Sequence, residues 1–254
     1  SAVQIRPPQP IMKKKILIFI VTYKASFRLL KLIQKIPYKK LSNYNYTVFI
    51  SDDNSEDLAS FKYIKIVKNR YGSKIKINYN KKNLGYGGNI KKCINYAYKK
   101  KFNYAIMLHG DNQYNPKYID KMLKLISKKN YDAIVGSRLK KRENALKGNM
   151  PVYKYIGNII LSKYFNIFFN TKFTDCHTGY WFYNLSNIPK KYFDNCDDNF
   201  CFDLDLRLQL VNKNKNIKEI AINTFYGTER SSFHVIYAAR FFYKVIKYKL
   251  LKLL

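Results

Sequence analysis

Acidic residues and long hydrophobic runs are scarce in this sequence. The 254 residues contain 16 Asp and Glu against 48 Lys and Arg, which gives a formal net charge of +32. A chain this basic favours anionic partners, whether nucleotide phosphates, anionic lipid or nucleic acid. The cations are nearly all Lys and are spread along the whole chain, which indicates a biased genome more than a designed patch. No apolar run approaches the roughly 20 residues that a membrane-spanning helix needs, so no such helix is expected.

Cysteine is also scarce, with four residues and no CxxC pair (Cys93, Cys176, Cys196 and Cys201). This usage predicts free thiols in a reducing compartment. A zinc site built from the last three together with His177 is conceivable, but its spacings match none of the usual zinc ribbons or fingers. We therefore leave His177 out of the predicted site and treat it as a satisfied polar residue.

The beginning of the chain predicts a short lead followed by a core strand. Residues 1–12 are Pro-rich and patternless, so we expect a disordered lead or a tag. Lys13–Lys15 followed by ILIFIV resembles the start of a signal peptide, but the apolar run is too short and lacks a cleavage site. The rest of the chain divides into one domain over residues 13–232 and a basic amphipathic helix over residues 233–254.

Strand and helix periods alternate along the domain. Apolar runs predict buried strands, and apolar residues at every third or fourth position predict helices. The expected strands are 16–22, 46–51, 74–79, 104–107, 133–138 and 219–225, and the expected helices are 26–36, 90–100, 117–129, 153–169 and 200–211. Residues 200–210 also alternate as a strand would, and the helix is preferred because its pattern continues to Val211. Residues 140–150 are expected to be a polar, mobile connection, and 175–184 a strand or loop. This alternation predicts an α/β fold with a mostly parallel, Rossmann-like sheet flanked by helices.

Three turns that follow successive strands carry the polar chemistry. They are DDNSED at Asp52–Asp57, NLGYGGN at Asn83–Asn89 and HGDNQ at His109–Gln113. In a parallel sheet such turns emerge at one edge and can share a ligand. Carboxylates in the first turn suit a nucleobase or ribose, glycines in the second allow close approach of phosphate or sugar, and the third can hold a divalent ion against a diphosphate.

Each turn also has an ordinary structural interpretation. Asp52 and Asp53 can form an Asx-turn, and the glycines can simply open a helix. Asn112 or Asn115 can cap the helix that begins near Pro116. The GYGG sequence fails the dinucleotide fingerprint, because it follows the third strand and lacks the third glycine.

Eight motifs in order resemble one known family. They are VTYKA, SDDNSED, NLGYGGN, HGDNQ, VGSR, DCHTGYWFY, FDLDLRLQ and YGTERSS, and they extend over nearly all of residues 15–232. The set resembles the family 2 glycosyltransferases with the GT-A fold, and within them the branch that transfers sugars to polyprenyl or dolichyl phosphate. The resemblance implies an inverting enzyme that moves a sugar from a UDP- or GDP-linked donor to a lipid phosphate, with a divalent cation, Mn²⁺ or Mg²⁺, as cofactor.

Residue roles follow from the turns and from this resemblance. The predicted nucleotide-sugar contacts are Thr22, Tyr23, Asp52, Asp53, Asn83, Gly85, Gly88 and Asp111. The predicted metal ligands are Asp111, Gln113 and His109, where His109 replaces the first Asp of the family's DxD motif and suits Mn²⁺ better than Mg²⁺. The predicted catalytic set is Asp111, Arg138, Arg230, Asp175, Asp203 and Asp205.

The acceptor has two alternatives, a lipid phosphate or a sugar hydroxyl. Arg138 and Arg230 match positions that hold phosphates, while an Arg of the lipid-phosphate branch has only Lys154 as its nearest counterpart. An ionised phosphate acceptor needs no general base, whereas a sugar hydroxyl of a surface polysaccharide or glycolipid would need one. Asp203, Asp205 and Asp175 are the candidates, and the alternative for FDLDL is a structural helix with solvated carboxylates.

The last helix predicts a further partner. Arg240, Lys244 and Lys247 alternate with apolar residues, so the helix can lie on an anionic membrane surface or pack on its own domain. We expect a cytoplasmic enzyme, peripheral on the cytoplasmic face of the membrane, in cell-envelope glycan synthesis. The rival class, a non-catalytic module that binds nucleic acid or a membrane surface, would have no use for three acidic turns, so nucleic acid is not an expected partner.

Overall fold

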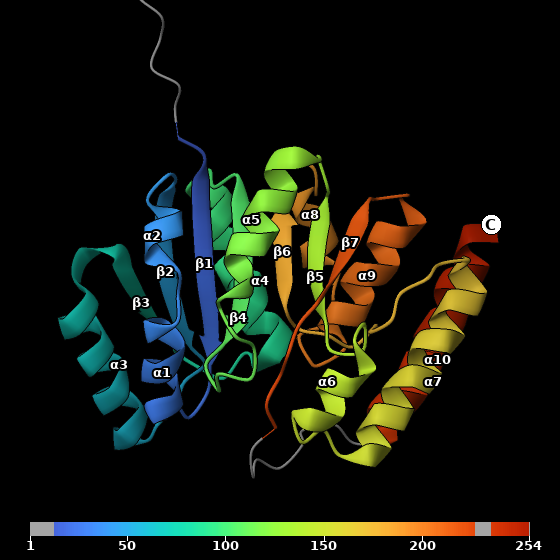
Figure 1. Cartoon of the computed structure of the whole chain (residues 1–254), viewed down its shortest axis with the longest axis horizontal. Helices are drawn as coiled ribbons and strands as arrows, with labels where there is room; N and C mark the ends of the chain where they lie inside the picture. The colour runs from blue at the N-terminus through green and yellow to red at the C-terminus, as the bar shows by residue number, and fades with distance from the viewer. Residues whose placement is uncertain (1–12, 227–234, 254) are drawn as a thin grey trace, which may run out of the picture.

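One seven-stranded sheet forms the centre of this computed structural model, which describes residues 13–226 and 235–253 (Figure 1). The strands are β1 Lys15–Thr22, β2 Asn45–Asp52, β3 Ile75–Tyr79, β4 Tyr104–His109, β5 Ala133–Ser137, β6 Trp181–Asn184 and β7 Ile217–Ala221. Their order in the sheet is β3-β2-β1-β4-β6-β5-β7. Only β6 runs antiparallel to its neighbours within the described ranges, between β4 and β5. The predicted mostly parallel α/β sheet is confirmed.

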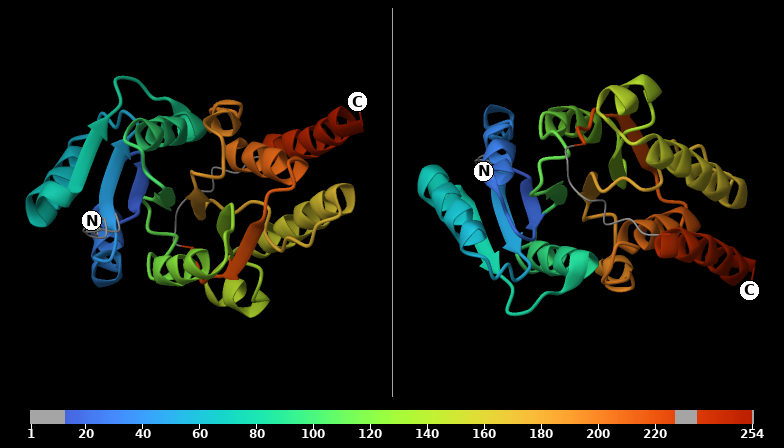
Figure 2. Two further views of the ribbon diagram at one scale, coloured as in Figure 1. Left: turned by 90° about the horizontal axis from the view of Figure 1, so that it is seen from above. Right: turned by 90° about the horizontal axis from the view of Figure 1, so that it is seen from below.

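Helices cover both faces of this sheet. They are α1 Phe27–Gln34, α2 Tyr38–Leu41, α3 Leu58–Tyr71, α4 Gly85–Lys99, α5 Tyr118–Lys128, α6 Arg142–Lys147, α7 Val152–Phe169, α8 Lys190–Asp194, α9 Phe202–Asn212 and α10 Val235–Leu253, with a short 3₁₀ turn at Gly72–Lys74. Apolar residues of α1, α3 and α5 share one core with the sheet, and those of α4, α8 and α9 share the other. Seen from above and from below, the helices lie on both sides of the sheet (Figure 2).

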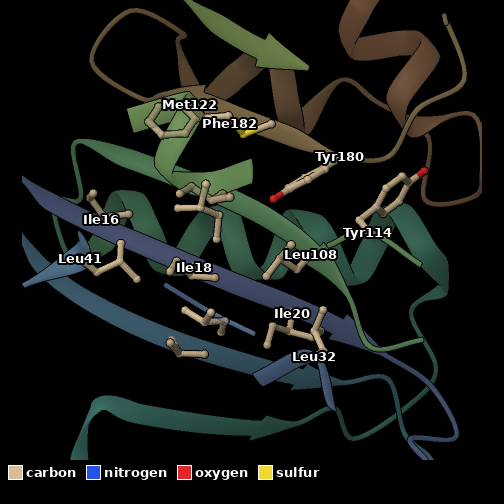
Figure 3. Packing of buried hydrophobic residues seen from close by; sticks show 14 of the residues in the cluster. Ile16, Ile18, Ile20, Leu32, Leu41, Leu108, Tyr114, Met122, Tyr180 and Phe182 are labelled. Carbon is tan, nitrogen blue, oxygen red and sulfur yellow. The ribbon is translucent and has the colours of Figure 1, made fainter. Parts of the chain in front are cut away.

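Strand β1 shows why the sequence reads as a continuous apolar run. Ile16, Ile18 and Ile20 point into one core, where they meet residues such as Leu32, Leu108 and Met122 (Figure 3). Leu17 and Phe19 point into the opposite core. A central parallel strand is buried on both faces, so polar residues do not alternate along it. Its carboxyl end at Thr22 is thereby fixed beside the ends of β2 and β4.

Helices α7 and α10 lie side by side at one end of the molecule (Figures 1 and 2). Leu161 and Phe165 of α7 share a small core with Phe241 and Val245 of α10 and with residues of α9. One side of α10 therefore packs on its own domain, as the alternative interpretation predicted. No helix in the described ranges is both long enough and apolar enough to traverse a bilayer.

Some local predictions were wrong. The connection predicted over residues 140–150 contains α6, because Leu139, Ala145 and Met150 are buried together despite the polar sequence around them. The helix predicted to begin at Ile90 begins at Gly85, and the last predicted strand ends at Ala221. Helix α3 was not predicted. The helices predicted over 153–169 and 200–211 are confirmed as α7 and α9, whereas residues 1–12 lie outside the described residues.

Candidate functional site

A cavity of about 920 Å³ lies at the carboxyl edge of the sheet and extends to the first half of α7 and of α10. Its lining includes Thr22 at the end of β1, Asp53 after β2, Asn83 after β3, and His109 and Asp111 at and after the end of β4. The three polar turns therefore meet at one edge of the sheet, as the sequence predicted. We divide the cavity into two parts and name them after the roles expected from the sequence: the donor half is formed by these turns, and the acceptor half by α7, α9, α10 and the segments before β6 and after β7.

The predicted nucleotide-sugar residues separate into two groups. Those that line the cavity are Thr22, Tyr23, Asp53, Asn83, Gly85 and Asp111, whereas Asp52 and Gly88 do not. The Asp52 carboxylate is 1% exposed and accepts hydrogen bonds from the amide and hydroxyl of Ser55, at 2.8 and 2.7 Å. It closes its own turn, which is the alternative that the sequence left open, and the geometry does not support a contact with the nucleotide.

Asp53 is the carboxylate of the first turn that faces the cavity. Its Oδ1 accepts from the side-chain amide of Asn80 at 2.8 Å and from the backbone amide of Leu84 at 2.9 Å. These bonds tie the turn after β2 to the turn after β3. Because its carboxylate is anchored by groups from another turn, Asp53 is a pre-oriented acceptor for a hydroxyl or N–H of a ligand.

The glycine-rich sequence forms the first turn of α4 instead of a loop before it. The amides of Gly87 and Gly88 donate to the carbonyl of Asp198, at 2.8 and 3.1 Å. A Cβ at Gly87 would lie 2.1 Å from the carbonyl oxygen of Asp197. The close approach that these glycines allow is therefore made by the chain itself, and not by a phosphate at the two amides.

His109 lies in an aromatic setting. Its ring makes edge contacts with Tyr86 and Tyr114, with centroid distances of 5.5 and 5.1 Å, and its Nε2 lies 3.3 Å from the Tyr86 hydroxyl. A Cβ at Gly179 would lie 2.6 Å from the ring, so this glycine makes room for it. Burial lowers the pKa of His109, which keeps the imidazole neutral.

The three predicted metal ligands all line the cavity but do not form a closed site. His109 faces Tyr86, while Asp111 is exposed and accepts from the amide of Gln113 at 2.9 Å. Within residues 13–226 and 235–253, no group of three or more His, Cys, Asp and Glu comes together as a metal site, and the four cysteines are free and buried. A site with one exposed carboxylate and one carboxamide still suits Mg²⁺ or Mn²⁺ when substrate phosphates supply further oxygens.

Asp203 is the carboxylate of the acceptor half. It lies in the first turn of α9, lines the cavity and is 8% exposed. Its Oδ2 accepts from the Tyr86 hydroxyl at 2.7 Å, and its buried Oδ1 accepts no hydrogen bond from the described residues. Burial raises the pKa of Asp203 to about 7, although the Tyr86 hydrogen bond acts in the opposite direction. Such a carboxyl group can exchange a proton near neutral pH.

The other two candidate bases are not available in this way. Both oxygens of Asp205 accept from Lys244, at 2.7 and 2.9 Å, and Asp205 is outside the cavity lining. Asp175 is fully buried and paired with Arg138, whose Nε and Nη2 donate to its two oxygens at 2.7 and 2.8 Å. Burial acts to raise the pKa of Asp175, but Arg138 outweighs it and the pKa is lowered. Neither geometry supports a role as general base.

Arg138 lines the cavity, and most of its donors are used within the protein. Besides the pair with Asp175, its Nη1 donates to the Tyr226 hydroxyl at 3.0 Å. It supports the acceptor half more than it offers a free phosphate clamp. Lys154 of α7 lines the same region, and burial followed by the charge of Arg138 lowers its pKa. Arg230, the other residue predicted to hold a phosphate, lies outside the described residues.

Sequence reasoning missed Tyr86, which lines the cavity, and two buried residues that support the site from outside that lining, Glu219 and Arg207. Tyr86 lies inside the glycine motif, which predicts a backbone contact and gives no signal for a role of the Tyr86 ring. Glu219 accepts from the amides of Thr174 and Asp175 and so holds the loop that carries the Arg138 partner. Arg207 is fully buried one helical turn after Asp203 and stacks on Phe173 and Trp181. Their roles follow from the folded positions of α4, β7 and α9, which bring these side chains to partners distant in sequence.

A family model for glycosyl transferase family 2 matches residues 17–189. The chain belongs to glycosyl transferase family 2. An uncharacterized protein of Methanocaldococcus jannaschii is 28% identical over 206 residues, which are 77% of this chain and 83% of that relative. The low-salt glycan biosynthesis hexosyltransferase Agl6 of Haloferax volcanii is 31% identical over 94 residues, which are 35% of this chain and 22% of Agl6.

Solved structures share the fold at low sequence identity. Glucosyl-3-phosphoglycerate synthase from Mycobacterium tuberculosis in complex with UDP superposes with a TM-score of 0.63 and 9% identity, over 94% of this chain and 80% of that chain. S. aureus TarS in complex with UDP-GlcNAc superposes with a TM-score of 0.55 and 15% identity, over 94% of this chain and 66% of that chain. The expected GT-A fold, in a single domain with a mostly parallel sheet, is thus confirmed.

Proposed function

We propose that this chain is an inverting glycosyltransferase that moves a sugar from a nucleotide diphosphate onto a hydroxyl group of a lipid-linked or surface glycan. The observation that carries the proposal is Asp203, a carboxyl group with a pKa near 7 in the cavity that also contains Asp53 and Asp111. The donor half offers acceptors for the nucleoside and an exposed carboxylate for the diphosphate. Structural neighbours described with UDP and with UDP-GlcNAc support this choice of donor.

A divalent cation fits the donor half in an open site. Asp111 and Gln113 would hold it, with diphosphate oxygens as its remaining ligands, and it would neutralise the charge of the leaving diphosphate. His109 is not part of this set, because its ring packs between Tyr86 and Tyr114. Glucosyl-3-phosphoglycerate synthase is described in complex with Mn²⁺ and, separately, with Mg²⁺, which supports a divalent cation as cofactor.

The residues of the chain then divide the reaction between them. Asp203 accepts the proton of the acceptor hydroxyl as its oxygen attacks the anomeric carbon from the face opposite the nucleotide. The new bond joins this oxygen to the anomeric carbon, and the bond from that carbon to the diphosphate oxygen breaks with its electron pair leaving on the nucleotide. Tyr86 donates to the Asp203 carboxylate and fixes its direction.

A lipid phosphate, such as polyprenyl phosphate, is the second candidate acceptor. Lys154 lines the acceptor half close enough to Arg138 for that charge to lower its pKa. Because Arg138 is paired with Asp175, Lys154 is the cation that can meet an anionic acceptor group here. A phosphate is already ionised, so this reaction would not depend on Asp203. The two acceptors therefore make opposite predictions for an Asp203→Asn variant.

Donor binding tests the proposal first. Thermal unfolding of the wild-type chain is measured with a panel of UDP- and GDP-sugars and Mn²⁺ or Mg²⁺, since a ligand that binds the folded state raises the unfolding temperature. We expect one nucleotide sugar to stabilise the wild type and to lose most of this effect with Asp111→Asn. Asp120→Asn in α5, where Asp120 pairs with Lys124 on the surface, is the matched control and should respond like the wild type. Indifference to every nucleotide sugar would contradict the proposal.

A further inference from the structure

One surface of the molecule exposes many large apolar side chains on two adjacent helices. Helix α7 exposes Val152, Tyr153, Ile156, Ile160 and Ile167, each by 51–79%, and α10 exposes Tyr243, Ile246 and Leu250 by 63, 42 and 57%. We call these eight side chains the α7–α10 face. Their spacing of mostly three, four or seven residues places them on one side of each helix. Monomeric proteins rarely expose a contiguous patch of this kind unless it binds something.

The two stripes belong to one surface. Leu161 and Phe165 of α7, and Phe241 and Val245 of α10, are buried in the core that these helices share with α9. The exposed residues lie on the opposite side of each helix from that core. Because α7 and α10 run side by side (Figures 1 and 2), the exposed stripes together form a layer that faces away from the domain.

The same two helices carry only positive charge. Neither sequence contains Asp or Glu, while α7 has Lys154 and Lys163 and α10 has five cations, Arg240, Lys244, Lys247, Lys249 and Lys252. Lys163, Arg240 and Lys247 are exposed beside the apolar stripes. Lys244 instead pairs with Asp197 and Asp205 below the face. Aliphatic and aromatic side chains are therefore interleaved with cations on the exposed side.

We propose that the α7–α10 face docks on an anionic lipid bilayer. Apolar side chains enter the boundary of headgroups and acyl chains while Lys and Arg meet lipid phosphates, which is how amphipathic helices lie in the plane of a membrane. A second copy of this chain is a poorer partner, because a two-fold contact would oppose the same cations. Nucleic acid is also poorer, because its phosphates offer nothing to Ile156, Ile246 or Leu250.

The cavity opens at this face. Tyr153 and Ile160 both line the cavity and are more than half exposed. A lipid-linked acceptor can therefore pass from the bilayer between α7 and α10 toward Asp203. This consequence rests on the proposed function, whereas the docking itself does not, because it concerns a bilayer without any acceptor.

Vesicle flotation of the full chain tests the docking. Vesicles of phosphatidylcholine with phosphatidylglycerol should bind the wild type, and vesicles of phosphatidylcholine alone should bind it far less. Replacing Ile156, Ile246 and Leu250 by Ser should weaken binding by ~100-fold, from the apolar area no longer buried. The control replaces Leu58, Phe61 and Tyr79 by Ser, which are exposed by 86, 43 and 44% at the β3 edge of the sheet, and should bind like the wild type.

Charge variants separate this face from the general positive charge of the chain. Arg240→Gln with Lys247→Gln should weaken binding about 10- to 30-fold, whereas Lys62→Gln with Lys65→Gln on α3 should have little effect. The proposal would be overturned if the two Gln double variants lost vesicle binding equally, or if the Ser variant of the face lost none. Light scattering that shows a wild-type dimer, which the Ser variant of the face converts to a monomer with unchanged vesicle binding, would assign the face to a second copy instead. Nucleotide-sugar stabilisation of all variants is measured separately, so a failure of docking does not bear on donor binding.

Discussion

The donor and acceptor halves of the cavity are held together in different ways. In the donor half, polar side chains are bound from within their own turn or from the turn after the next strand, as Asp111 is by Gln113 two residues later and Asp53 by Asn80, 27 residues later. In the acceptor half the partners are remote, since 117 residues separate Tyr86 from Asp203. Local turns can be recognised in a sequence, whereas remote pairs exist only once the sheet has formed. The acceptor half therefore depends more on global folding: burial there raises the pKa of Asp203, whereas Arg138 outweighs burial and lowers the pKa of Asp175.

Of the variants that separate the two halves, Asp203→Asn should have the largest effect on activity. The amide cannot accept the acceptor proton, so kcat for transfer to a hydroxyl should fall about 10²- to 10⁴-fold. The dissociation constant for the nucleotide sugar should stay unchanged, because donor contacts lie in the other half. Steady-state kinetics and calorimetric titration with the donor measure the two quantities. An unchanged kcat would indicate that the acceptor is a phosphate.

The same variant should be more stable than the wild type at alkaline pH. The folded pKa of Asp203, about 7, lies above its ordinary value of 3.8. Between those values the folded state keeps a proton that the unfolded state has lost, so the contribution of Asp203 to stability falls as pH rises through this window. Asn avoids burying the charge. The unfolding temperature of Asp203→Asn relative to the wild type should therefore rise from pH 4 to pH 8, and a constant difference would contradict the raised pKa.

Asp175→Asn should cause the largest loss of stability in the acceptor half. The variant leaves the buried Arg138 guanidinium without its charged partner. Breaking a buried ion pair in this way costs about 3–5 kcal/mol of stability. Urea unfolding monitored by circular dichroism measures this loss. Asp194→Asn removes a surface pair with Lys190 and should cost less than about 1 kcal/mol. Similar losses for the two variants would mean that the buried pair contributes little to the fold.

The sequence predicted the donor half well for a physical reason. The ends of β1, β2 and β4 are fixed by apolar runs, and turns that follow parallel strands must meet at one edge, so Asp53, Asn83 and Asp111 could be placed together in advance. The distinction between Asp52 and Asp53 could not be predicted, because it depends on the turn conformation at Ser55. Asp203, Asp205 and Asp175 looked alike in sequence. Only burial and the positions of Lys244 and Arg138 separate them.

Gly87→Ala should test whether the glycine motif serves packing or the ligand. The new Cβ would lie 2.1 Å from the backbone carbonyl of Asp197, which cannot move away as a flexible side chain could, so about 1–3 kcal/mol of stability should be lost. Gly157→Ala in α7 meets no atom within 4 Å and should instead gain about 0.5–1 kcal/mol from helix propensity. Donor affinity measured by calorimetry should change little in Gly87→Ala. A large loss of donor affinity without a loss of stability would indicate that the glycine motif binds the donor.

Tyr86→Phe should give the smallest effect, and the most informative one, because Tyr86 joins the two halves. Its hydroxyl donates to Asp203 and lies beside His109 of the donor half. Removing the hydroxyl deletes a hydrogen bond that favours the charged form of Asp203, so the pKa of Asp203 should rise further. A hydrogen bond to a charged group contributes about 1.5–3 kcal/mol, which corresponds to an upward shift of about 1–2 pH units in the acid limb of kcat/KM. Tyr114→Phe, which removes a hydroxyl on the other side of His109 without touching Asp203, should leave the limb in place. If both variants shift the limb equally, the proton is controlled by the aromatic packing around His109 and not by the Tyr86 hydrogen bond.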